Sequence, residues 1–342
     1  MLVARRRRRR VSLWQYFGAL TARTASKAML DAVKSEVLVL LTSFVTPEAE
    51  QKTKEPDVAV DAAVAAVFTV LLFALNWGLR LVVVKPFATR ILGGGRSRAF
   101  RAKVTKFSQA AMECLIYGSF TLLGARIVPR QPWIWPSKHW WIGFSSGSHA
   151  AMRDDLRCYY LLYGARYVQG ALSVLLEPKR KDFVEMQLHH VVTVAVVAIS
   201  YLYGWNRIGC VVMVLLDPAD VPLHVAKMFK YVADARERKD RGLARVCTFC
   251  ADRVFELFAV FFLVTRISMY PYVCWSAHVE ATRYFPKGVP EWTCVGLLWT
   301  LYGLQCYWFF LIIKVAIKML VSGGGAEDNR SDDEDDEPPK KD

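Results

Sequence analysis

The amino-acid sequence predicts an all-α polytopic membrane protein with about seven transmembrane helices. Mean hydropathy is +0.21, and the apolar residues come in long blocks instead of being spread evenly along the chain. A transmembrane β-barrel would show segments of about 10 alternating residues instead. A spanning helix needs about 20 predominantly apolar residues, and seven blocks meet or approach that length: roughly 58–84, 107–128, 156–177, 183–203, 207–227, 253–275 and 292–320.

A basic segment, residues 1–57, precedes the first block. It contains the arginine run Arg5–Arg10, but no apolar region follows these arginines directly, which argues against a secretory signal peptide. The apolar stretch Val37–Val45 is too short to span a bilayer. We expect Leu13–Val45 to form an amphipathic helix that lies on a membrane surface. The side of the membrane that holds the N-terminus stays open.

Lysine and arginine follow every second block. They cluster at 85–106, 179–181, 227–245 and 314–318, whereas the loops near 129–150, 204–207 and 276–291 are poorer in positive charge. Because positive charge collects on the cytosolic side, the odd-numbered blocks are expected to end in the cytosol, together with the C-terminus. The net charge of +14 then reflects membrane topology, and no nucleic-acid partner is expected.

The charge pattern also divides the chain. Residues 58–106 are read as the first transmembrane helix and a basic cytosolic linker, 107–320 as the main helical domain, and 321–342 as an acidic, disordered cytosolic tail. Cys274 and Cys294 flank one predicted lumenal loop. They are either a disulfide or two thiols that behave as small apolar side chains.

Two adjacent histidines, His189 and His190, lie within the apolar block 183–203. Ionisable side chains inside a membrane are functional-site candidates by default. The next block carries Asp217 and Asp220, spaced to lie on one helix face. Because an unpaired buried carboxylate is costly, we expect a carboxylate to orient and charge an imidazole. Zinc or iron is the competing chemistry, but the chain has six histidines and lacks histidine-rich boxes, so no metal is expected.

Short motifs follow one another between Lys179 and Tyr231. They are Lys179-Arg180-Lys181-Asp182-Phe183, His189-His190-x-x-Thr193, Ser200-Tyr201, Arg207-Ile208-Gly209, Asp217-x-x-Asp220 and Ala226-Lys227-Met228. Together they closely resemble the signature of ceramide synthases, the longevity-assurance branch of TLC-domain proteins. The resemblance covers roughly residues 58–337. It extends into the tail, where Asp328–Asp332 resembles an acidic phosphorylation motif with Ser331 as the phosphorylated residue.

This resemblance implies a TLC domain at 107–320, with six helices forming a barrel around a lipid cavity in the endoplasmic reticulum membrane. It implies transfer of a fatty acyl group from acyl-CoA, a co-substrate and not a cofactor, to the amine of a sphingoid base. The product is dihydroceramide or ceramide. His189, His190, Asp217 and Asp220 are the implied catalytic residues. The implied substrate-binding residues are Arg180, Lys181, Asp182, Thr193, Ser200, Tyr201, Arg207 and Lys227.

The sequence departs from the family pattern at three places. Leu216 stands where many members have histidine, so a mechanism that needs a third histidine there is not supported. His224 stands where an acidic residue is common. Only about 20 residues separate Pro86 from the second block. The homeobox-like insert of some members is therefore missing, and DNA binding is not implied.

Two catalytic routes stay open at this stage. A histidine acts as general base toward the amine, or it attacks the thioester and forms an acyl-imidazole. A non-catalytic TLC-domain protein that senses or handles lipids is the alternative function. Dimerisation, an accessory subunit, the preferred base and the acyl-chain length cannot be read. The resemblance implies that the loop near Ser268–Trp292 is the region to examine for the preferred acyl-chain length.

Overall fold

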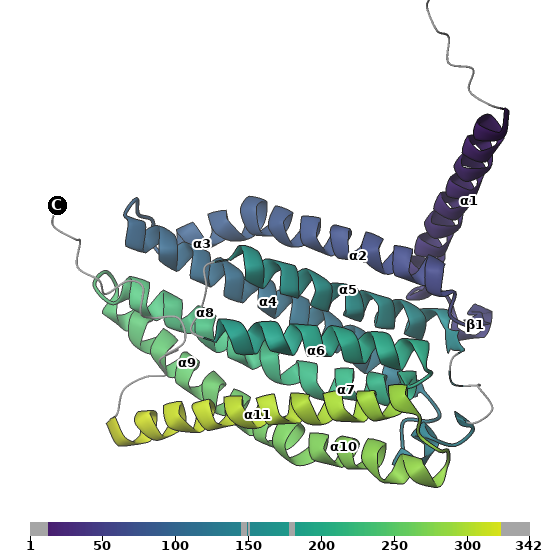
Figure 1. Ribbon diagram of the computed structural model, residues 1–342. Coiled ribbons are helices and arrows are strands. Elements are labelled where there is room, and N and C mark those ends of the chain that lie inside the picture. Colours follow the sequence, from purple (N-terminus) through teal and green to yellow (C-terminus); the bar gives the residue numbers. More distant parts are fainter. Residues whose placement is uncertain (1–12, 145–148, 150, 178–181, 323–342) are drawn as a thin grey trace, which may run out of the picture.

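The computed structural model describes residues 13–144, 149, 151–177 and 182–322, and it confirms an all-α membrane fold. Long helices run side by side between two ends of a bundle, and α1 leaves the bundle at an angle (Figure 1). The helices are α1 (Leu13–Ser43), α2 (Val58–Leu79), α3 (Lys85–Ile91), α4 (Arg98–Ile127), α5 (Asp154–Leu176), α6 (Phe183–Leu202), α7 (Asn206–Leu216), α8 (Asp220–Arg236), α9 (Arg241–Phe262), α10 (Tyr270–His278) and α11 (Val289–Ser322). Two short strands, β1 (Thr53–Lys54) and β2 (Met152–Arg153), form an antiparallel pair.

Local sequence explains where several helices begin. The Asp57 carboxylate accepts hydrogen bonds from two backbone N–H groups of the first turn of α2. Ser97 caps α4 and Asp240 caps α9 in the same way. A helix start leaves four backbone N–H groups without partners, and short polar side chains satisfy them best.

Three of the long helical rods contain irregular turns. A π-helical segment, Arg80–Val84, joins α2 to α3, and another, Leu263–Met269, joins α9 to α10. A 3₁₀ turn, Asp217–Ala219, joins α7 to α8. Pro218 in that turn has no N–H to donate, which interrupts the α-helical bonding. Such irregular turns occur frequently at functional sites.

The two ends of the bundle differ in chemistry. One end, here called the basic end, carries the connections 92–97 and 237–240; there Arg236 donates to the backbone carbonyl of Ile91 at 2.7 Å. The other end, here called the aromatic end, holds Trp141 against Trp205, with ring centroids 5.1 Å apart. Helix α1 and strand β1 lie at the aromatic end (Figure 1).

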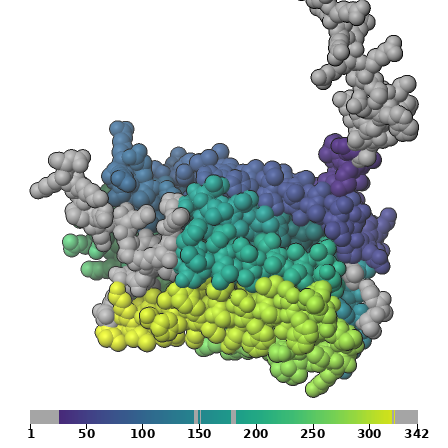
Figure 2. Space-filling view, in the orientation of Figure 1, coloured from purple at the N-terminus to yellow at the C-terminus, as the bar shows by residue number. Residues whose placement is uncertain are grey.

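The outer surface of the bundle suits a bilayer. Large apolar side chains are exposed along the rods, among them Val70, Leu122 and Val184, and α11 forms a broad part of one face (Figure 2). A soluble protein rarely exposes so much apolar surface. Among the described residues, five helical segments are long and apolar enough to cross a membrane: Val58–Ile91, Arg98–Arg130, Phe183–Leu202, Asn206–Arg236 and Val289–Met319.

The expected seven spans and the closed six-helix barrel stay predictions. The two expected spans outside this group correspond to α5 and to α9 with α10. The alternative of a disulfide between Cys274 and Cys294 is not realised, because both are buried free thiols. The expected helix at Leu13–Val45 is confirmed as α1, whereas its position on a membrane surface stays a prediction.

An ion cluster joins α1 to the bundle. The buried Arg157 of α5 donates to Glu36 of α1 and to Asp61 of α2. The hydroxyl of Tyr201 on α6 also donates to Asp61, at 2.7 Å. Buried charges are tolerated when they are paired and hydrogen-bonded. This arrangement therefore connects four helices near the aromatic end.

Candidate functional site

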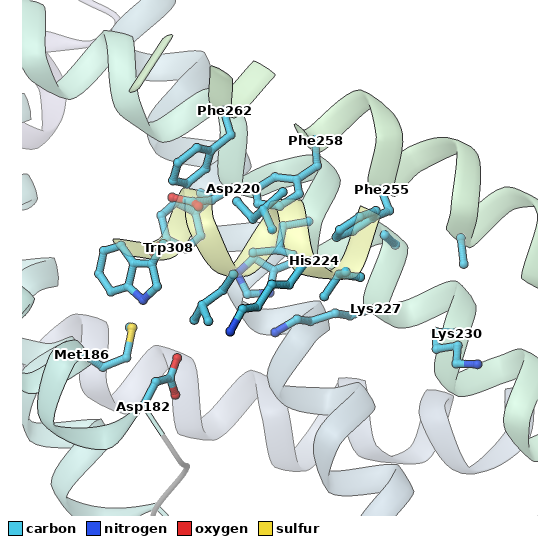
Figure 3. Close-up of a pocket in the computed structure, with 18 of the residues that line it drawn as sticks. Asp182, Met186, Asp220, His224, Lys227, Lys230, Phe255, Phe258, Phe262 and Trp308 are labelled. Atoms are coloured by element: carbon cyan, nitrogen blue, oxygen red, sulfur yellow. The ribbon is translucent and has the colours of Figure 1, made fainter. Parts of the chain in front are cut away.

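A large cavity lies among α6, α8, α9 and α11. It encloses about 1530 Å³, including its open mouth. Figure 3 shows Phe255, Phe258 and Phe262 on one side and Asp182 and Met186 on the opposite side. Three cations line the part toward the basic end, namely Lys227, Lys230 and Lys314. Asp182 and Asp234 line the cavity too, and Asp234 pairs with Lys230 at 3.2 Å. The cavity thus combines an apolar wall with a mouth whose lysines outnumber its carboxylates.

His189 lies where this cavity meets a second one. The second cavity, here called the slot, encloses about 510 Å³ among α5, α6, α7 and α11, and His189 lines both. The imidazole packs edge to face against Trp308 and Tyr167, with centroid distances of 5.3 and 5.8 Å. Within the described part of the chain, its buried Nδ1 has no hydrogen-bond partner. His224 also lines the large cavity, and among the described histidines His189 is the one that lines both cavities.

His190 has a different environment. Its Nδ1–H donates to the backbone carbonyl of Met186 at 2.7 Å, which leaves Nε2 as the acceptor of the neutral ring. The ring points to α5 at Gly170, where an added Cβ would lie 2.7 Å from Nε2. Glycine at position 170 is therefore what makes room for this imidazole.

Substituting Gly170 with alanine should displace the His190 ring, which packs edge to face against His189 with ring centroids 5.7 Å apart. We expect activity to fall about 10-fold or more, because small misplacements within a reaction site are costly. The measurement is the rate of product formation in membranes, normalised to folded protein. Gly118→Ala is the control, since a Cβ there would meet no atom within 4 Å. Equal activity of the two variants would contradict a role for His190 placement.

Asp217 pairs with an arginine. It is buried in the 3₁₀ turn, where it accepts from Arg166 Nη1 at 2.8 Å and from the Tyr163 hydroxyl at 3.1 Å. The Arg166 guanidinium is stacked over the ring of Tyr117 at 4.1 Å and lies 5.0 Å from the Phe120 ring centroid. Stacking on aromatic faces favours a guanidinium over an ammonium at such a buried position.

Asp220 pairs with a second arginine, Arg266, which lies in the π-helical segment and donates to the carboxylate at 2.5 Å. The same guanidinium donates to the backbone carbonyl of Leu216 at 2.9 Å. That carbonyl is available because the backbone N–H of Asp220 bonds to Asp217 in the 3₁₀ turn. Both irregular turns therefore contribute to one polar contact beside the large cavity.

The expected pairing of a carboxylate with an imidazole is wrong. Both Asp217 and Asp220 neutralise arginines, because a guanidinium carries a permanent charge and offers two parallel donors. The two carboxylates also do not share one partner, since the turn at Pro218 directs them to different helices. Asp220 lines the large cavity and Asp217 lines neither cavity, whereas the rings of His189 and His190 pack against each other.

The other predicted residues fall into three groups. Asp182 and Lys227 line the large cavity, and Thr193 and Ser200 line the slot. Two residues lie near the aromatic end: Tyr201 in the ion cluster, and Arg207, which donates to the backbone carbonyl of His139 at 2.7 Å. Arg180, Lys181 and Ser331 lie outside the described residues.

Three residues that contact the predicted site residues were not identified from the sequence: Arg166, Arg266 and Tyr167. A signal for the arginines was present, because each is a charged residue in the interior of an expected span, as the two aspartates are. A buried carboxylate needs a cationic partner more strongly than it needs an imidazole. Tyr167 gave no such signal, since aromatic residues are common throughout these helices.

The sequence profile of the TLC domain matches residues 106–314, which is more than half of the chain. The chain belongs to the TLC-domain family, in its longevity-assurance branch with the ceramide synthases. It is 30% identical to Homo sapiens ceramide synthase 5 over 219 residues, 64% of this chain and 52% of that protein. It is 29% identical to Arabidopsis thaliana ceramide synthase LOH2 over 270 residues, 75% of this chain and 86% of that protein.

A third relative is the Alternaria stem canker resistance protein 1 of Solanum lycopersicum, 31% identical over 217 residues. That match covers 61% of this chain and 65% of the relative. The similarity to the human protein spans about half of that protein's length. The comparisons therefore define the family of this chain.

Proposed function

We propose that this protein is a ceramide synthase that transfers a fatty acyl group from acyl-CoA to the amine of a sphingoid base such as sphinganine. One observation supports this most strongly: His189 lies between a cavity with a cationic mouth and an apolar slot. Acyl-CoA has the matching order of parts, with phosphates, then a thioester, then a hydrocarbon tail. The names of the relatives support the same reaction class.

In this proposal the thioester carbonyl lies beside His189. The amine nitrogen of the base bonds to the carbonyl carbon and the carbon–sulfur bond breaks. His189 accepts the proton that the amine loses and returns it to the leaving thiolate of CoA. In the covalent version of the reaction, the imidazole bonds to the carbonyl carbon first and the amine then displaces it. Either version needs a neutral imidazole nitrogen facing the thioester.

The lysines at the mouth are proposed to bind the phosphates of CoA. Replacing Lys227 and Lys314 together with alanine should raise KM for acyl-CoA about 10-fold and leave kcat nearly unchanged, because such contacts stabilise substrate and transition state equally. Initial rates at varied acyl-CoA concentration measure this. Lys318→Ala, an exposed lysine one turn beyond Lys314, is the control and should keep the original KM. A fall in kcat at unchanged KM would contradict phosphate binding.

The test of the function is synthesis in membranes that lack their own ceramide synthase. Sphinganine is supplied with acyl-CoAs of graded length, and N-acylated products are measured by mass spectrometry. We expect dihydroceramide from the wild type. Absence of product, with a known ceramide synthase active in parallel, would instead favour a lipid-handling TLC-domain protein.

Four further properties are part of this proposal. They are location in the endoplasmic reticulum membrane, a cytosolic C-terminus, contact with membrane lipids, and no cofactor beside the co-substrate. Dimers or a small accessory subunit are compatible with it. Ser331 is the proposed phosphorylated residue, to be checked by mass spectrometry of the native protein.

A further inference from the structure

The slot has the form of a channel with one closed end. Each of its four helices contributes a stripe of residues that runs in the same direction, from the level of His189 toward the aromatic end. On α6 the stripe is His189, Thr193, Val196, Val197 and Ser200, which is one face of a helix. On α11 the stripe is Leu301, Leu298 and Cys294, in order of increasing distance from His189.

The depth of the slot follows from helix geometry. Ser200 comes 11 positions after His189 (200 − 189 = 11) on the unbroken helix α6, which is about 16 Å at 1.5 Å per residue. An extended hydrocarbon chain advances about 1.25 Å per carbon, given carbon–carbon bonds of about 1.5 Å at near-tetrahedral angles. The slot therefore accepts a chain of about 14 carbons when carbon 1 lies beside His189.

A polar floor closes the slot. The Tyr160 hydroxyl forms a hydrogen bond with Ser200, and both side chains are buried. Gly209 of α7 faces this hydroxyl so closely that an added Cβ would clash with it. Behind the floor, Tyr201 belongs to the ion cluster of Asp61. A longer hydrocarbon chain would have to separate buried hydrogen-bonded groups, which is unfavourable in a medium without water.

We propose that the slot binds the acyl tail and that the floor formed by Tyr160 and Ser200 sets the longest acyl chain, at about 14 carbons. This inference rests on the proposed ceramide synthesis. The acyl tail is favoured over the tail of the base because the slot continues the line from the cationic mouth past His189. The chain-length determinant then includes the helices that line the slot, and Tyr270 and Cys274 of the expected region Ser268–Trp292 contact one of its lining residues, Leu298.

The stripe on α11 offers a graded test. Leu301→Phe, Leu298→Phe and Cys294→Phe place the same ring at increasing depth, in steps of about 5 Å or four carbons. The longest accepted acyl-CoA should be shortest for Leu301→Phe, intermediate for Leu298→Phe, and closest to wild type for Cys294→Phe. Thr300→Phe puts the ring on the exposed face of the same helix and should leave the profile unchanged.

Opening the floor should have the opposite effect. Tyr160→Ala removes the ring and the hydrogen bond to Ser200, so the ratio of 18-carbon to 14-carbon product should rise about 10-fold or more. An unchanged chain-length profile in Tyr160→Ala and in the three α11 variants would overturn the inference. A profile that follows the length of the sphingoid base, and not of the acyl-CoA, would overturn it as well.

The position of the acyl tail can also be measured by photolabelling the wild-type protein, so that no variant has to fold. A 14-carbon acyl-CoA with a terminal diazirine is irradiated in membranes, and the labelled peptides are identified by mass spectrometry. We expect the label near Ser200, Gly209 or Cys294, and a label confined to the connection 279–287 between α10 and α11 would overturn the inference. Because labelling needs only binding, it can succeed where synthesis fails. Absence of N-acylated product from every acyl-CoA would refute the proposed function. A label away from Ser200, Gly209 and Cys294 would refute only the inference that the acyl tail ends at Tyr160 and Ser200.

Discussion

Replacing His189 with alanine should lower the rate of acyl transfer about 100- to 10,000-fold, the usual contribution of a positioned acid–base group. The reason is its position, since His189 is the imidazole that lines both the large cavity and the slot. His190→Ala should also lower the rate, but its ring points to Gly170 and not into either cavity. The measurement is N-acylated product per folded protein, from initial rates.

His278→Ala is the matched control, because His278 is an exposed histidine near the aromatic end. It should retain wild-type activity. Incubation with acyl-CoA alone separates the two routes: an acyl group trapped on the peptide that contains His189 supports the covalent route. Full activity of His189→Ala would contradict a catalytic role for His189 and would place the reaction away from the point where the two cavities meet.

The second large effect concerns stability. Arg166→Met leaves the buried carboxylate of Asp217 without its cation, and Asp217→Leu leaves the guanidinium without its anion. Each single change should cost about 3–5 kcal/mol of unfolding free energy, whereas the double variant should recover most of that loss. Thermal unfolding in detergent gives the comparison. The non-additivity is the diagnostic result, because it isolates the interaction between the two side chains.

An exposed pair provides the control. Arg253 and Glu256 of α9 form an ion pair at 2.5 Å, with about half of each side chain exposed. Arg253→Met and Glu256→Leu should each change stability by less than about 1 kcal/mol. If the losses from Arg166→Met and Asp217→Leu simply add in the double variant, the two residues do not act as a pair.

The sequence predicted the membrane class and the helical blocks well, because hydropathy reports the apolar face of each span directly. It predicted helix ends less well. Helix α4 begins at Arg98, before the apolar block that starts near 107, and α8 continues to Arg236. These helices extend past their apolar parts. Their limits there depend on capping residues, such as Ser97 at the start of α4, and hydropathy does not detect such residues.

Several predicted residues line the cavities, among them His189, Asp220 and Thr193, but the pairing of the aspartates was not predicted, and the catalytic roles stay predictions. Spacing along one chain placed Asp217 and Asp220 beside the histidine-bearing block, yet their partners Arg166 and Arg266 come from α5 and the segment after α9. Those contacts depend on how helices distant in sequence pack together. The role of Gly170 could not be predicted from the sequence for the same reason. Only the packing of α5 against α6 shows that the absence of a side chain at position 170 leaves room for His190.

The cluster around Arg157 has a consequence for the folding unit of this protein. The family profile begins at residue 106, but Glu36 and Asp61, which neutralise Arg157, lie before it. A chain that began at residue 106 would carry Arg157 as a buried cation without these two carboxylates. Glu36 of α1 and Asp61 of α2 therefore act as intramolecular counter-ions for the domain, and we expect a stable fragment to include both helices.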